Sequence, residues 1–311
     1  MRIRPIEAIH FAALAALTGL ALLLWGRIED PRAMLLGYAG LAALVALAVP
    51  LASRADRLPW PLAFFVDFYS AAFIPLLFNT LEPLIQALRG GPRDEWLIAA
   101  DRTLFGVDVT VWAQRLVRPW LNDVFYSFYS TYYFIALTLG IVLWVRDRAT
   151  ARRFVYTLMV VYYVSWTGYF IVPALGPRFA QAAEYTISLT TTPLARTIND
   201  TINSLEKTKF DVFPSGHTMI SVAVLIVAWR RARDVFWILL PIAAGLVIST
   251  VYCRFHYVID VIAGMTLAFI TVPVGDGIYD RLMAARGLPG RGTARADRRE
   301  DEPRASYSAF S

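Results

Sequence analysis

The chain has 311 residues, of which 57% are hydrophobic, 14% aromatic and 17% charged. Soluble globular proteins carry about 25% charged residues, so this composition argues against a soluble protein and favours one covered by lipid over much of its surface. The net charge of +6 does not indicate a nucleic-acid partner, because the basic residues concentrate in loops between apolar runs and in the C-terminal tail, as membrane orientation requires.

Eight apolar stretches are candidates to cross a bilayer, for which a helix needs roughly 20 mostly apolar residues. Asp67 and Pro75 interrupt the third stretch, and Arg230 and Arg231 can extend the short sixth one by snorkelling. We therefore predict an all-α, polytopic membrane helix bundle with about eight transmembrane helices. Its spans are 8–26, 33–52, 62–81, 123–145, 153–172, 216–230, 235–253 and 257–274.

Arginine-rich loops predict the orientation. The loops 53–58, 146–153 and 230–234 and the tail after 280 all fall on the side of the two termini when eight helices cross the membrane. The positive-inside rule makes that side cytoplasmic. We predict a multi-pass protein of the bacterial cytoplasmic membrane, with the loops 82–122 and 173–215 and the junction 254–256 facing outward.

The two outer loops contain amphipathic segments. "WLIAADRTLFG" and "VWAQRLVRPW" are typical of short interfacial helices, anchored by Trp96, Trp112 and Trp120. "PLARTINDTINSLE" is predicted to be a helix that covers a pocket mouth or lies on the bilayer surface. Its apolar face is expected to hold Leu194, Ile198, Ile202 and Leu205. The tail from 286 has few apolar residues and is predicted to be disordered.

Cysteine and histidine are scarce in this chain. The single Cys253 excludes an intramolecular disulfide and a thiolate metal cluster within one chain. Of the three histidines, His10 lies alone in the first apolar stretch and is expected to be a packed residue. His217 in "PSGH" and His256 in "RFHYVIDVIAG" both fall at the predicted outward ends of their spans.

His256 and Asp260 are four residues apart, which places them on one face of a helix. A carboxylate there can hold one ring nitrogen and leave the other basic, although a purely structural His–Asp pair has the same spacing. Arg254 and Arg178 fall at the same depth, where guanidinium groups suit phosphate oxygens but can also snorkel to lipid headgroups.

The stretch "DVFPSGHT" supplies Ser215 and Gly216 at the expected start of a helix, where a hydroxyl and free amides suit an anion. The combination predicts phosphoryl transfer without a metal cage. One histidine attacks phosphorus and the other protonates the leaving oxygen.

"FPSGHT" followed by "STVYCRFHYVIDVIAG" resembles the second and third signature motifs of the type 2 phosphatidic acid phosphatase superfamily. That superfamily also includes the vanadium haloperoxidases and the fungal-type inositol phosphorylceramide synthases; the apolar spans exclude a soluble haloperoxidase. The resemblance implies a six-helix catalytic core at 61–275, with two additional N-terminal helices at 1–60 and a disordered cytoplasmic tail at 276–311.

The resemblance also implies roles for individual residues. Ser215 and Gly216 match the phosphate-binding positions of the second motif, and His217 matches its general acid. His256 matches the nucleophile that becomes phosphohistidine, and Asp260 matches the carboxylate that orients it.

Two departures from the motifs are visible. Where the third motif has Ser-Arg, this chain has Ser249-Thr250, and Arg254 would share a helical face with position 250 and reach the same phosphate. The first motif's lysine is absent from "YFIVPALGPRF", where Arg178 is the remaining arginine. Lys209 or Lys207 can fill that gap or be solvated loop residues. "DRTLFG" resembles the inositol phosphorylceramide synthase branch, which also lacks this lysine.

The resemblance implies an integral membrane phosphatase that hydrolyses a lipid phosphate monoester or pyrophosphate on the extracytoplasmic face. One alternative is a phosphotransferase that moves a phospho-headgroup to a hydroxyl acceptor, and a second is a non-catalytic binder or transporter of phosphate-bearing lipids. The expected partners are the bilayer and a phosphorylated lipid. We predict no metal and no other cofactor, and the sequence does not indicate an oligomeric state.

Overall fold

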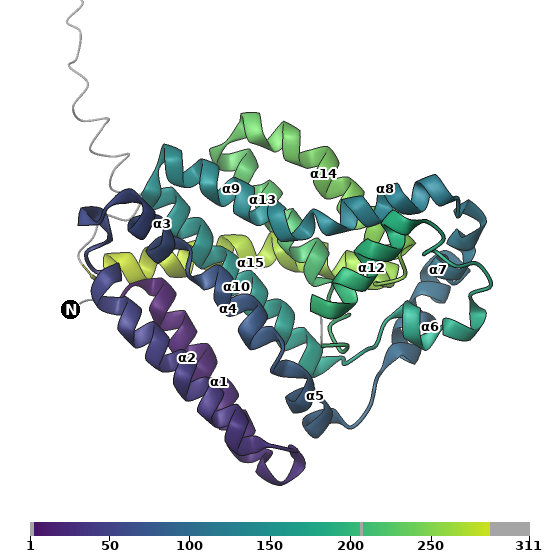
Figure 1. Cartoon of the computed structure of the whole chain (residues 1–311), viewed down its shortest axis with the longest axis horizontal. Helices are drawn as coiled ribbons and strands as arrows, with labels where there is room; N and C mark the ends of the chain where they lie inside the picture. The colour runs from purple at the N-terminus through teal and green to yellow at the C-terminus, as the bar shows by residue number, and fades with distance from the viewer. Residues whose placement is uncertain (1–2, 206–207, 287–311) are drawn as a thin grey trace, which may run out of the picture.

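A computed structural model describes residues 3–205 and 208–286, and all regular structure in these ranges is helical. This confirms the predicted all-α class. The α-helices are α1 (Pro5–Leu23), α2 (Pro31–Ala52), α3 (Trp60–Phe68), α4 (Ser70–Phe78), α5 (Leu81–Arg89), α6 (Asp94–Phe105), α7 (Val109–Trp112), α8 (Pro119–Ser130), α9 (Tyr132–Arg146), α10 (Arg148–Ile171), α11 (Pro177–Ala180), α12 (Pro193–Leu205), α13 (Gly216–Arg231), α14 (Arg233–Tyr252) and α15 (Val258–Ala284) (Figure 1).

Six helices in the described ranges are long and apolar enough to cross a membrane, and a seventh span is obtained if the bent pair α8–α9 is counted as one. The six are α1, α2, the continuous stretch Trp60–Phe78, α10, α14 and α15. The remaining predicted span is α13, which has only 16 residues and lies inside the bundle against α9, α10, α14 and α15. The chain is therefore a polytopic helical membrane protein.

Two predicted spans are each made of two helices. The span 62–81 is divided into α3 and α4 at Tyr69, which lies less than two turns before Pro75. A proline disturbs the turn on its N-terminal side because it lacks the N–H that would bond there. The span 123–145 is divided at Thr131, with a bend of 44° between α8 and α9. The Thr131 hydroxyl donates to the carbonyl of Phe128 at 2.6 Å, a local bond that competes with the helical pattern.

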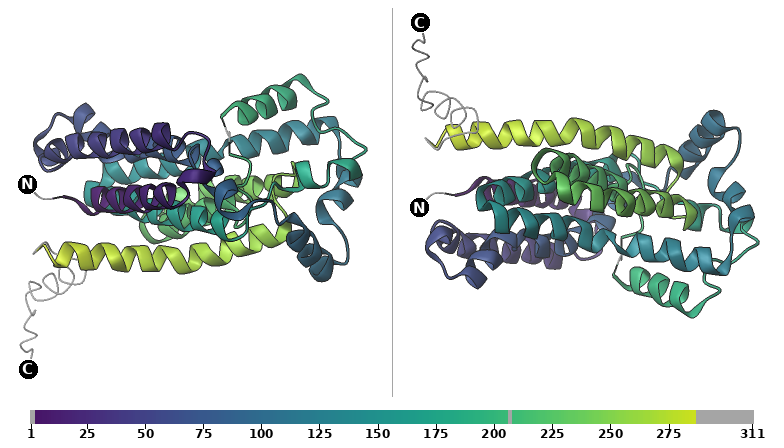
Figure 2. Two further views of the ribbon diagram at one scale, coloured as in Figure 1. Left: turned by 90° about the horizontal axis from the view of Figure 1, so that it is seen from below. Right: turned by 90° about the horizontal axis from the view of Figure 1, so that it is seen from above.

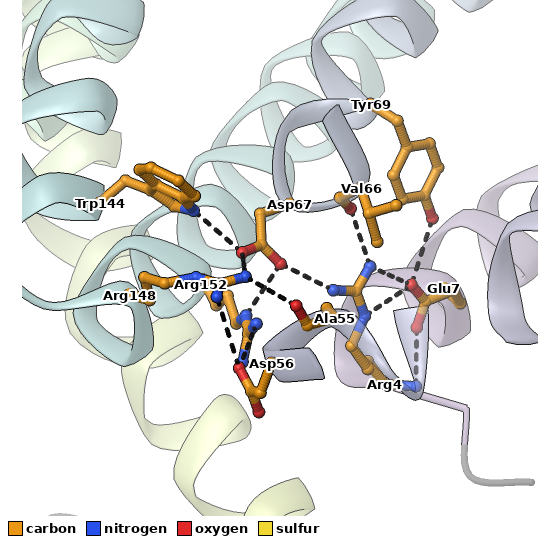
Figure 3. A network of polar contacts seen from close by, with 10 residues as sticks. All are labelled: Arg4, Glu7, Ala55, Asp56, Val66, Asp67, Tyr69, Trp144, Arg148 and Arg152. Atoms are coloured by element: carbon orange, nitrogen blue, oxygen red, sulfur yellow. Dashed lines mark hydrogen bonds and ion pairs between the residues drawn. The ribbon is translucent and has the colours of Figure 1, made fainter. Parts of the chain in front are cut away.

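Charged residues gather at the end of the bundle where α1 and α10 begin and α15 ends. Asp67, predicted as an interruption of an apolar span, is buried there in contact with three arginines and one tryptophan. Its carboxylate accepts hydrogen bonds of 2.8–3.0 Å from Arg4, Arg148, Arg152 and Trp144 (Figure 3). This cluster joins the N-terminal helix to α3 and to α10, and we call the end of the bundle that contains it the charged end.

The last helix is longer than predicted. Arg153 of α10 donates to Asp276 at 2.9 Å and to Asp280 at 2.8 Å, and α15 continues to Ala284. The predicted start of a disordered tail at 276 is therefore wrong, because these ion pairs extend the helix. The rest of the predicted tail, 287–311, lies outside the described residues. The beginning of α1 and the end of α15 lie at the same end of the bundle (Figure 2).

The opposite end, which we call the histidine end, carries α5 to α8, α11 and α12. The predicted interfacial segments are helical, as α6 and as α7 with a following 3₁₀ turn, and Trp96, Trp112 and Trp120 are exposed. The predicted helix α12 is also present and packs on α8.

The predicted apolar face of α12 is confirmed in part. Ile202 is buried and Ile198 packs beside it, as predicted, together with Ala195. Leu194 and Leu205, at the two ends of the predicted face, are exposed.

Candidate active site

The structure brings His217 and His256 together, although 39 residues separate them in the chain. His217 lies in the first turn of α13, and His256 lies in the turn between α14 and α15. Nδ1 of His217 is 3.2 Å from Nε2 of His256, and both side chains are buried.

Asp260 approaches the other nitrogen of His256. The distance from Nδ1 of His256 to Oδ2 of Asp260 is 3.6 Å, and the same carboxylate oxygen accepts a hydrogen bond from the backbone N–H of Tyr257 at 2.8 Å. The predicted reason for this proximity was wrong, because His256 precedes α15 and does not share a helix with Asp260. The connection 253–257 between α14 and α15 brings the side chains together instead.

The surroundings of His256 favour its neutral form. Burial lowers its pKa well below the ordinary value of 6.5, and the neighbouring His217 and Arg178 act in the same direction. With Nδ1 directed at Asp260, the favoured tautomer carries its proton on Nδ1 and leaves a lone pair on Nε2. That lone pair faces His217.

Ser215 and Gly216 form the start of α13 beside this pair. Ser215 is the N-cap residue; its hydroxyl accepts from the backbone N–H of Thr218 at 3.3 Å and from the Thr218 hydroxyl at 3.1 Å. The backbone N–H of Ser215 donates to the carbonyl of Asp260 at 3.0 Å. The two predicted motifs are thus joined through main chain as well as through the two rings.

Gly264 explains how α13 and α15 come so close. A Cβ atom at Gly264 would lie 2.5 Å from the carbonyl oxygen of Ser215, which no side chain can occupy without moving the backbone. Helices in membranes use small residues for such close approaches. Gly264 is part of "HYVIDVIAG", four residues after Asp260, so helical spacing alone indicates that the two share a face.

Arg178 lies at the edge of the histidine pair. Its backbone N–H donates to the carbonyl of Arg254 at 2.9 Å, and its guanidinium donates to Oδ1 of Asn203 in α12 at 3.0 Å. The guanidinium also stacks on the ring of Phe255, with its carbon 4.5 Å from the ring centre. Phe255 directly precedes His256, so Arg178 is anchored to the turn that carries the histidine.

Arg254 is placed differently from the prediction. α14 ends at Tyr252, and Arg254 has a left-handed backbone conformation with φ 65°, so it does not share a helical face with Thr250. Its guanidinium donates to the carbonyl of Ile187 at 2.8 Å and stacks over Tyr185 at 3.8 Å. Arg254 therefore connects the histidine turn to the loop before α12.

Lys209 is exposed and lies near Arg178. The nitrogen of its side chain is 5.6 Å from the centre of the Phe179 ring, and the guanidinium carbon of Arg178 is 4.7 Å from the same ring. The backbone N–H of Lys209 donates to Glu82 at 2.8 Å. The structure thus brings together the two predicted cations, while Lys207 lies outside the described residues.

Two acidic residues of α6 organise the site, and sequence reasoning did not identify them as such. Asp94 is buried and accepts hydrogen bonds from the backbone N–H groups of Leu175 and Gly176 at 2.9 and 2.8 Å and from the Tyr257 hydroxyl at 2.9 Å. It therefore ties the turn before Arg178 to the residue that follows His256.

Asp101 performs a related task seven residues further along α6. It accepts from the backbone N–H groups of Val258 and Ile259 at 2.9 and 2.8 Å, and so caps α15. Burial raises the pKa of Asp101, while these two hydrogen bonds oppose the rise. The spacing of seven residues, which places both acids on one face of a helix, was a signal that could have identified the pair.

Aromatic rings enclose His217. The ring of Tyr132 is centred 4.2 Å from that of His217, and the ring of Tyr129 is centred 4.7 Å away. Tyr129 also stacks on Phe255 at 4.2 Å. No motif in the sequence indicated these tyrosines, because α8 and α9 reach the site only through tertiary packing.

The remaining histidine and the cysteine lie elsewhere. His10 is fully buried, bonds to the hydroxyls of Tyr163 at 2.6 Å and Ser70 at 2.8 Å, and stacks on Phe73. This confirms it as a packed residue. Cys253 is a buried free thiol. In the described ranges, no three His, Cys, Asp or Glu side chains gather into a group that could hold a metal ion.

Comparison with known proteins supports the motif resemblance. A family model described as the PAP2 superfamily matches residues 95–274. The chain is 30% identical over 154 residues to a protein of Bacillus licheniformis named bacitracin transport permease protein BcrC. The aligned residues cover 49% of this chain and 68% of that protein.

A second relative comes from Bacteroides thetaiotaomicron and is named phosphoinositol dihydroceramide synthase. The identity is 28% over 191 residues, which cover 55% of this chain and 63% of that protein. No solved structure matches the chain significantly.

Proposed function

Because the chain belongs to the PAP2 superfamily, we propose that it is a membrane enzyme that hydrolyses a lipid phosphate monoester or pyrophosphate through a phosphohistidine. The observation that carries this proposal is the buried contact of 3.2 Å between His217 and His256, with Asp260 on the far side of His256. Such an arrangement supplies a nucleophile, its orienting carboxylate and an acid in one place.

In the first step, the lone pair on Nε2 of His256 attacks phosphorus, and the bond from phosphorus to the lipid oxygen breaks. The leaving oxygen takes a proton from His217, and Asp260 stabilises the positive charge that develops on the His256 ring. The products are phosphohistidine and a lipid alcohol, or a lipid monophosphate when the substrate is a pyrophosphate.

In the second step, water attacks the phosphorus of phosphohistidine and gives a proton to His217. The P–N bond breaks, inorganic phosphate leaves, and His256 regains its neutral form. The two steps return every group of the chain to its starting state.

In-line transfer requires that the nucleophile and the leaving oxygen lie on opposite sides of phosphorus. The hydrogen bond between His217 and His256 occupies that space in the resting site. Substrate binding must therefore separate the two rings.

Cationic side chains that can neutralise a bound phosphate lie at the edge of the site. Arg254 belongs to the histidine turn, Arg178 stacks on its Phe255, and Lys209 lies beside Arg178 over the Phe179 ring. In the described ranges no carboxylate forms an ion pair with either arginine. Together with the backbone N–H groups at the start of α13, these cations can neutralise the phosphoryl oxygens.

The alternative is a phosphotransferase, in which the hydroxyl of an acceptor replaces water in the second step. The likeness to a protein named phosphoinositol dihydroceramide synthase favours it, as does the absence of a lysine beside Arg178 in the first motif. Both reactions use the same first step and differ only in the acceptor.

We also propose that the histidine end faces away from the cytoplasm. The charged end carries the short arginine-rich loops 53–58, 146–153 and 230–234, which the positive-inside rule assigns to the cytoplasm. The lipid phosphate would then be taken from the outer leaflet.

The test is incubation of the purified protein in detergent micelles with labelled lipid phosphates and phospholipids, with and without hydroxyl acceptors. Free phosphate indicates the hydrolase, and a new headgroup lipid indicates the transferase. Rapid quenching at alkaline pH should trap an acid-labile phosphohistidine at His256. A protein that binds these lipids without turnover would refute both reactions, and loss of turnover in chelator would contradict the predicted independence from metals.

A further inference from the structure

The end of α10 and the start of α13 pack closely at two glycines. A Cβ atom at Gly168 in α10 would lie 2.1 Å from Cδ of Pro214, and one at Gly216 in α13 would lie 2.6 Å from the hydroxyl oxygen of Tyr169. Each side of this contact therefore lacks a side chain where the other approaches it. The contact places the last turn of α10, which contains Tyr169, against the turn that carries His217.

The backbone does not explain why residue 216 is a glycine. Gly216 begins α13, and it is not among the glycines with positive φ. A side chain at this position is excluded by two hydroxyl groups instead, because its Cβ atom would lie 2.6 Å from the oxygen of Tyr169 and 3.1 Å from that of Ser165. The glycine of "PSGH" therefore makes room for the hydroxyl of a tyrosine.

The Tyr169 hydroxyl lies inside the candidate active site. Tyr169 is 3% exposed and lines the same cavity as Gly216 and His217. The Ser165 hydroxyl donates to the Tyr169 oxygen at 3.0 Å. Because a tyrosine hydroxyl can both accept and donate, this bond leaves the donor role of Tyr169 to another acceptor.

We propose that Tyr169 is a phosphate-binding residue, whose hydroxyl donates a hydrogen bond to a phosphoryl oxygen of the bound substrate. This inference rests on the proposed function, in which the backbone N–H groups at the start of α13 hold the phosphoryl group. An oxygen held by those N–H groups lies beside Gly216, where the Tyr169 hydroxyl also lies. The bond is formed without transfer of a proton, so Tyr169 does not enter the two chemical steps at the histidines.

A neutral donor suits the buried side of the phosphate. The charge of the phosphoryl group is spread over its oxygens, and the cations Arg178 and Lys209 lie at the edge of the site. A further cation at the place of Tyr169 would have to lose its water, which is costly for a charge and much less so for a hydroxyl. A hydrogen bond from a hydroxyl to a charged oxygen is nevertheless stronger than one between neutral groups.

The experiment removes the hydroxyl and keeps the ring. In Tyr169→Phe, kcat/KM for hexyl phosphate in mixed micelles should fall by about ten- to a hundredfold, and the inhibition constant of inorganic phosphate should rise by about the same factor. Inorganic phosphate binds through its oxygens alone, so its inhibition reports on the phosphate site. The matched control is Tyr163→Phe in the same helix, whose hydroxyl bonds to His10 at 2.6 Å, and both wild-type values should be kept.

A second substitution separates phosphate binding from a structural role. Ser165→Ala removes the bond to Tyr169 but keeps the tyrosine hydroxyl, and it should lower kcat/KM less than Tyr169→Phe does. If the two variants lose turnover equally, while inorganic phosphate inhibits both as it inhibits the wild type, the hydroxyl only supports the helix contact and the proposal is overturned. Gel filtration of each preparation measures folding.

A double substitution tests the contact with Gly216. In Gly216→Ala the new methyl group should displace the Tyr169 hydroxyl and lower turnover. In Tyr169→Phe the nearest ring atom, Cζ, lies 4.0 Å from that methyl position, which is an ordinary contact. The combined loss should therefore be smaller than the product of the two single losses, and a combined loss equal to that product would contradict the contact.

The outcomes distinguish Tyr169 from the function as a whole. An active wild type whose turnover and phosphate inhibition are both unchanged in Tyr169→Phe would overturn the role of Tyr169 alone. A wild type that releases no phosphate from hexyl phosphate or hexadecyl phosphate would overturn the proposed function. If Gly216→Ala does not fold, the comparison of Tyr169→Phe with Ser165→Ala and Tyr163→Phe decides.

Discussion

At the charged end, Asp67 lies within 3.0 Å of three arginines, whereas at the histidine end Arg178 and Arg254 contact only neutral groups among the described residues. Beside the histidine pair, Asp94 and Asp101 accept hydrogen bonds from backbone N–H groups and a tyrosine instead. The same residue types are thus paired around Asp67 and kept apart beside the histidines, although Arg102 and Asp108 of the histidine end form an ion pair of 2.7 Å away from them.

This difference has a physical consequence. Three arginines around a buried carboxylate compensate its charge, and removing one partner of such a cluster is costly. Beside the histidines, the carboxylates of Asp94 and Asp101 accept hydrogen bonds from backbone N–H groups and, among the described residues, do not pair with arginine. The guanidinium groups of Arg178 and Arg254 therefore remain available to an anion. We expect substitutions at the charged end to change stability and those at the histidine end to change turnover.

The largest expected effect is on His256. His256→Ala removes the nucleophile and should lower kcat/KM for a lipid phosphate by at least about 10⁴-fold, as the loss of a covalent nucleophile does in other enzymes. Phosphate release and gel filtration on the same preparation would measure turnover and folding. His10→Ala is the matched control, since His10 is also buried but bonds only to Tyr163 and Ser70. An equal loss of turnover in the control would contradict the assignment of the site.

The second effect is on Asp67. Asp67→Ala leaves three arginines without their shared carboxylate and should lower the free energy of unfolding by about 3–5 kcal/mol, while turnover per folded molecule stays the same. Denaturation in detergent micelles measures it. Asp234→Ala, which removes an exposed ion pair with Arg146, should change stability little. If Asp67→Ala loses turnover but keeps its stability, the contrast between the ends is wrong.

The third effect is on Asp94, which positions the turns beside His256. Asp94→Ala should lower kcat by about ten- to a hundredfold through misplacement of the turns, with a smaller change in KM. Asp94→Asn keeps one oxygen acceptor and should lose less. The neighbouring Glu95 is exposed, and Glu95→Ala should have wild-type kinetics. A rise in KM alone would indicate substrate binding in place of positioning.

These contrasts show which features local sequence could predict. Apolar length predicts the spans because a helix in lipid must satisfy its own backbone polar groups. The site was predicted from two motifs whose histidines are 39 residues apart. Helix and strand periodicity do not predict that residues so far apart in the chain come into contact. Arg254 was placed on a helix because nothing in "YCRFH" indicates that α14 ends at Tyr252 and that the chain then adopts a left-handed turn.

The roles of Asp94 and Asp101 were missed for a related reason. In sequence they are two acids of a long polar loop, which is typical of solvated residues. Their hydrogen bonds are to residues 81 to 163 positions away. Such tertiary acceptors leave no periodic pattern beyond their spacing of seven residues.

The smallest expected effect concerns pH. His256 must be unprotonated to attack phosphorus, and burial lowers its pKa well below 6.5. As the pH falls through 6.5 the nucleophile therefore stays neutral. Hexyl phosphate itself takes up a proton at about pH 6, equally for the wild type and for Arg178→Gln, so the difference between their acid limbs in kcat/KM reports on His256. Arg178 also lowers this pKa by its positive charge, so Arg178→Gln should raise it and move the acid limb toward higher pH. The measurement is kcat/KM against pH for both proteins, with stability followed over the same range. An acid limb that stays in place in Arg178→Gln, or moves to lower pH, would show that the Arg178 guanidinium does not lower the pKa of His256. The unpaired arginine at the histidine end would then not act on the nucleophile.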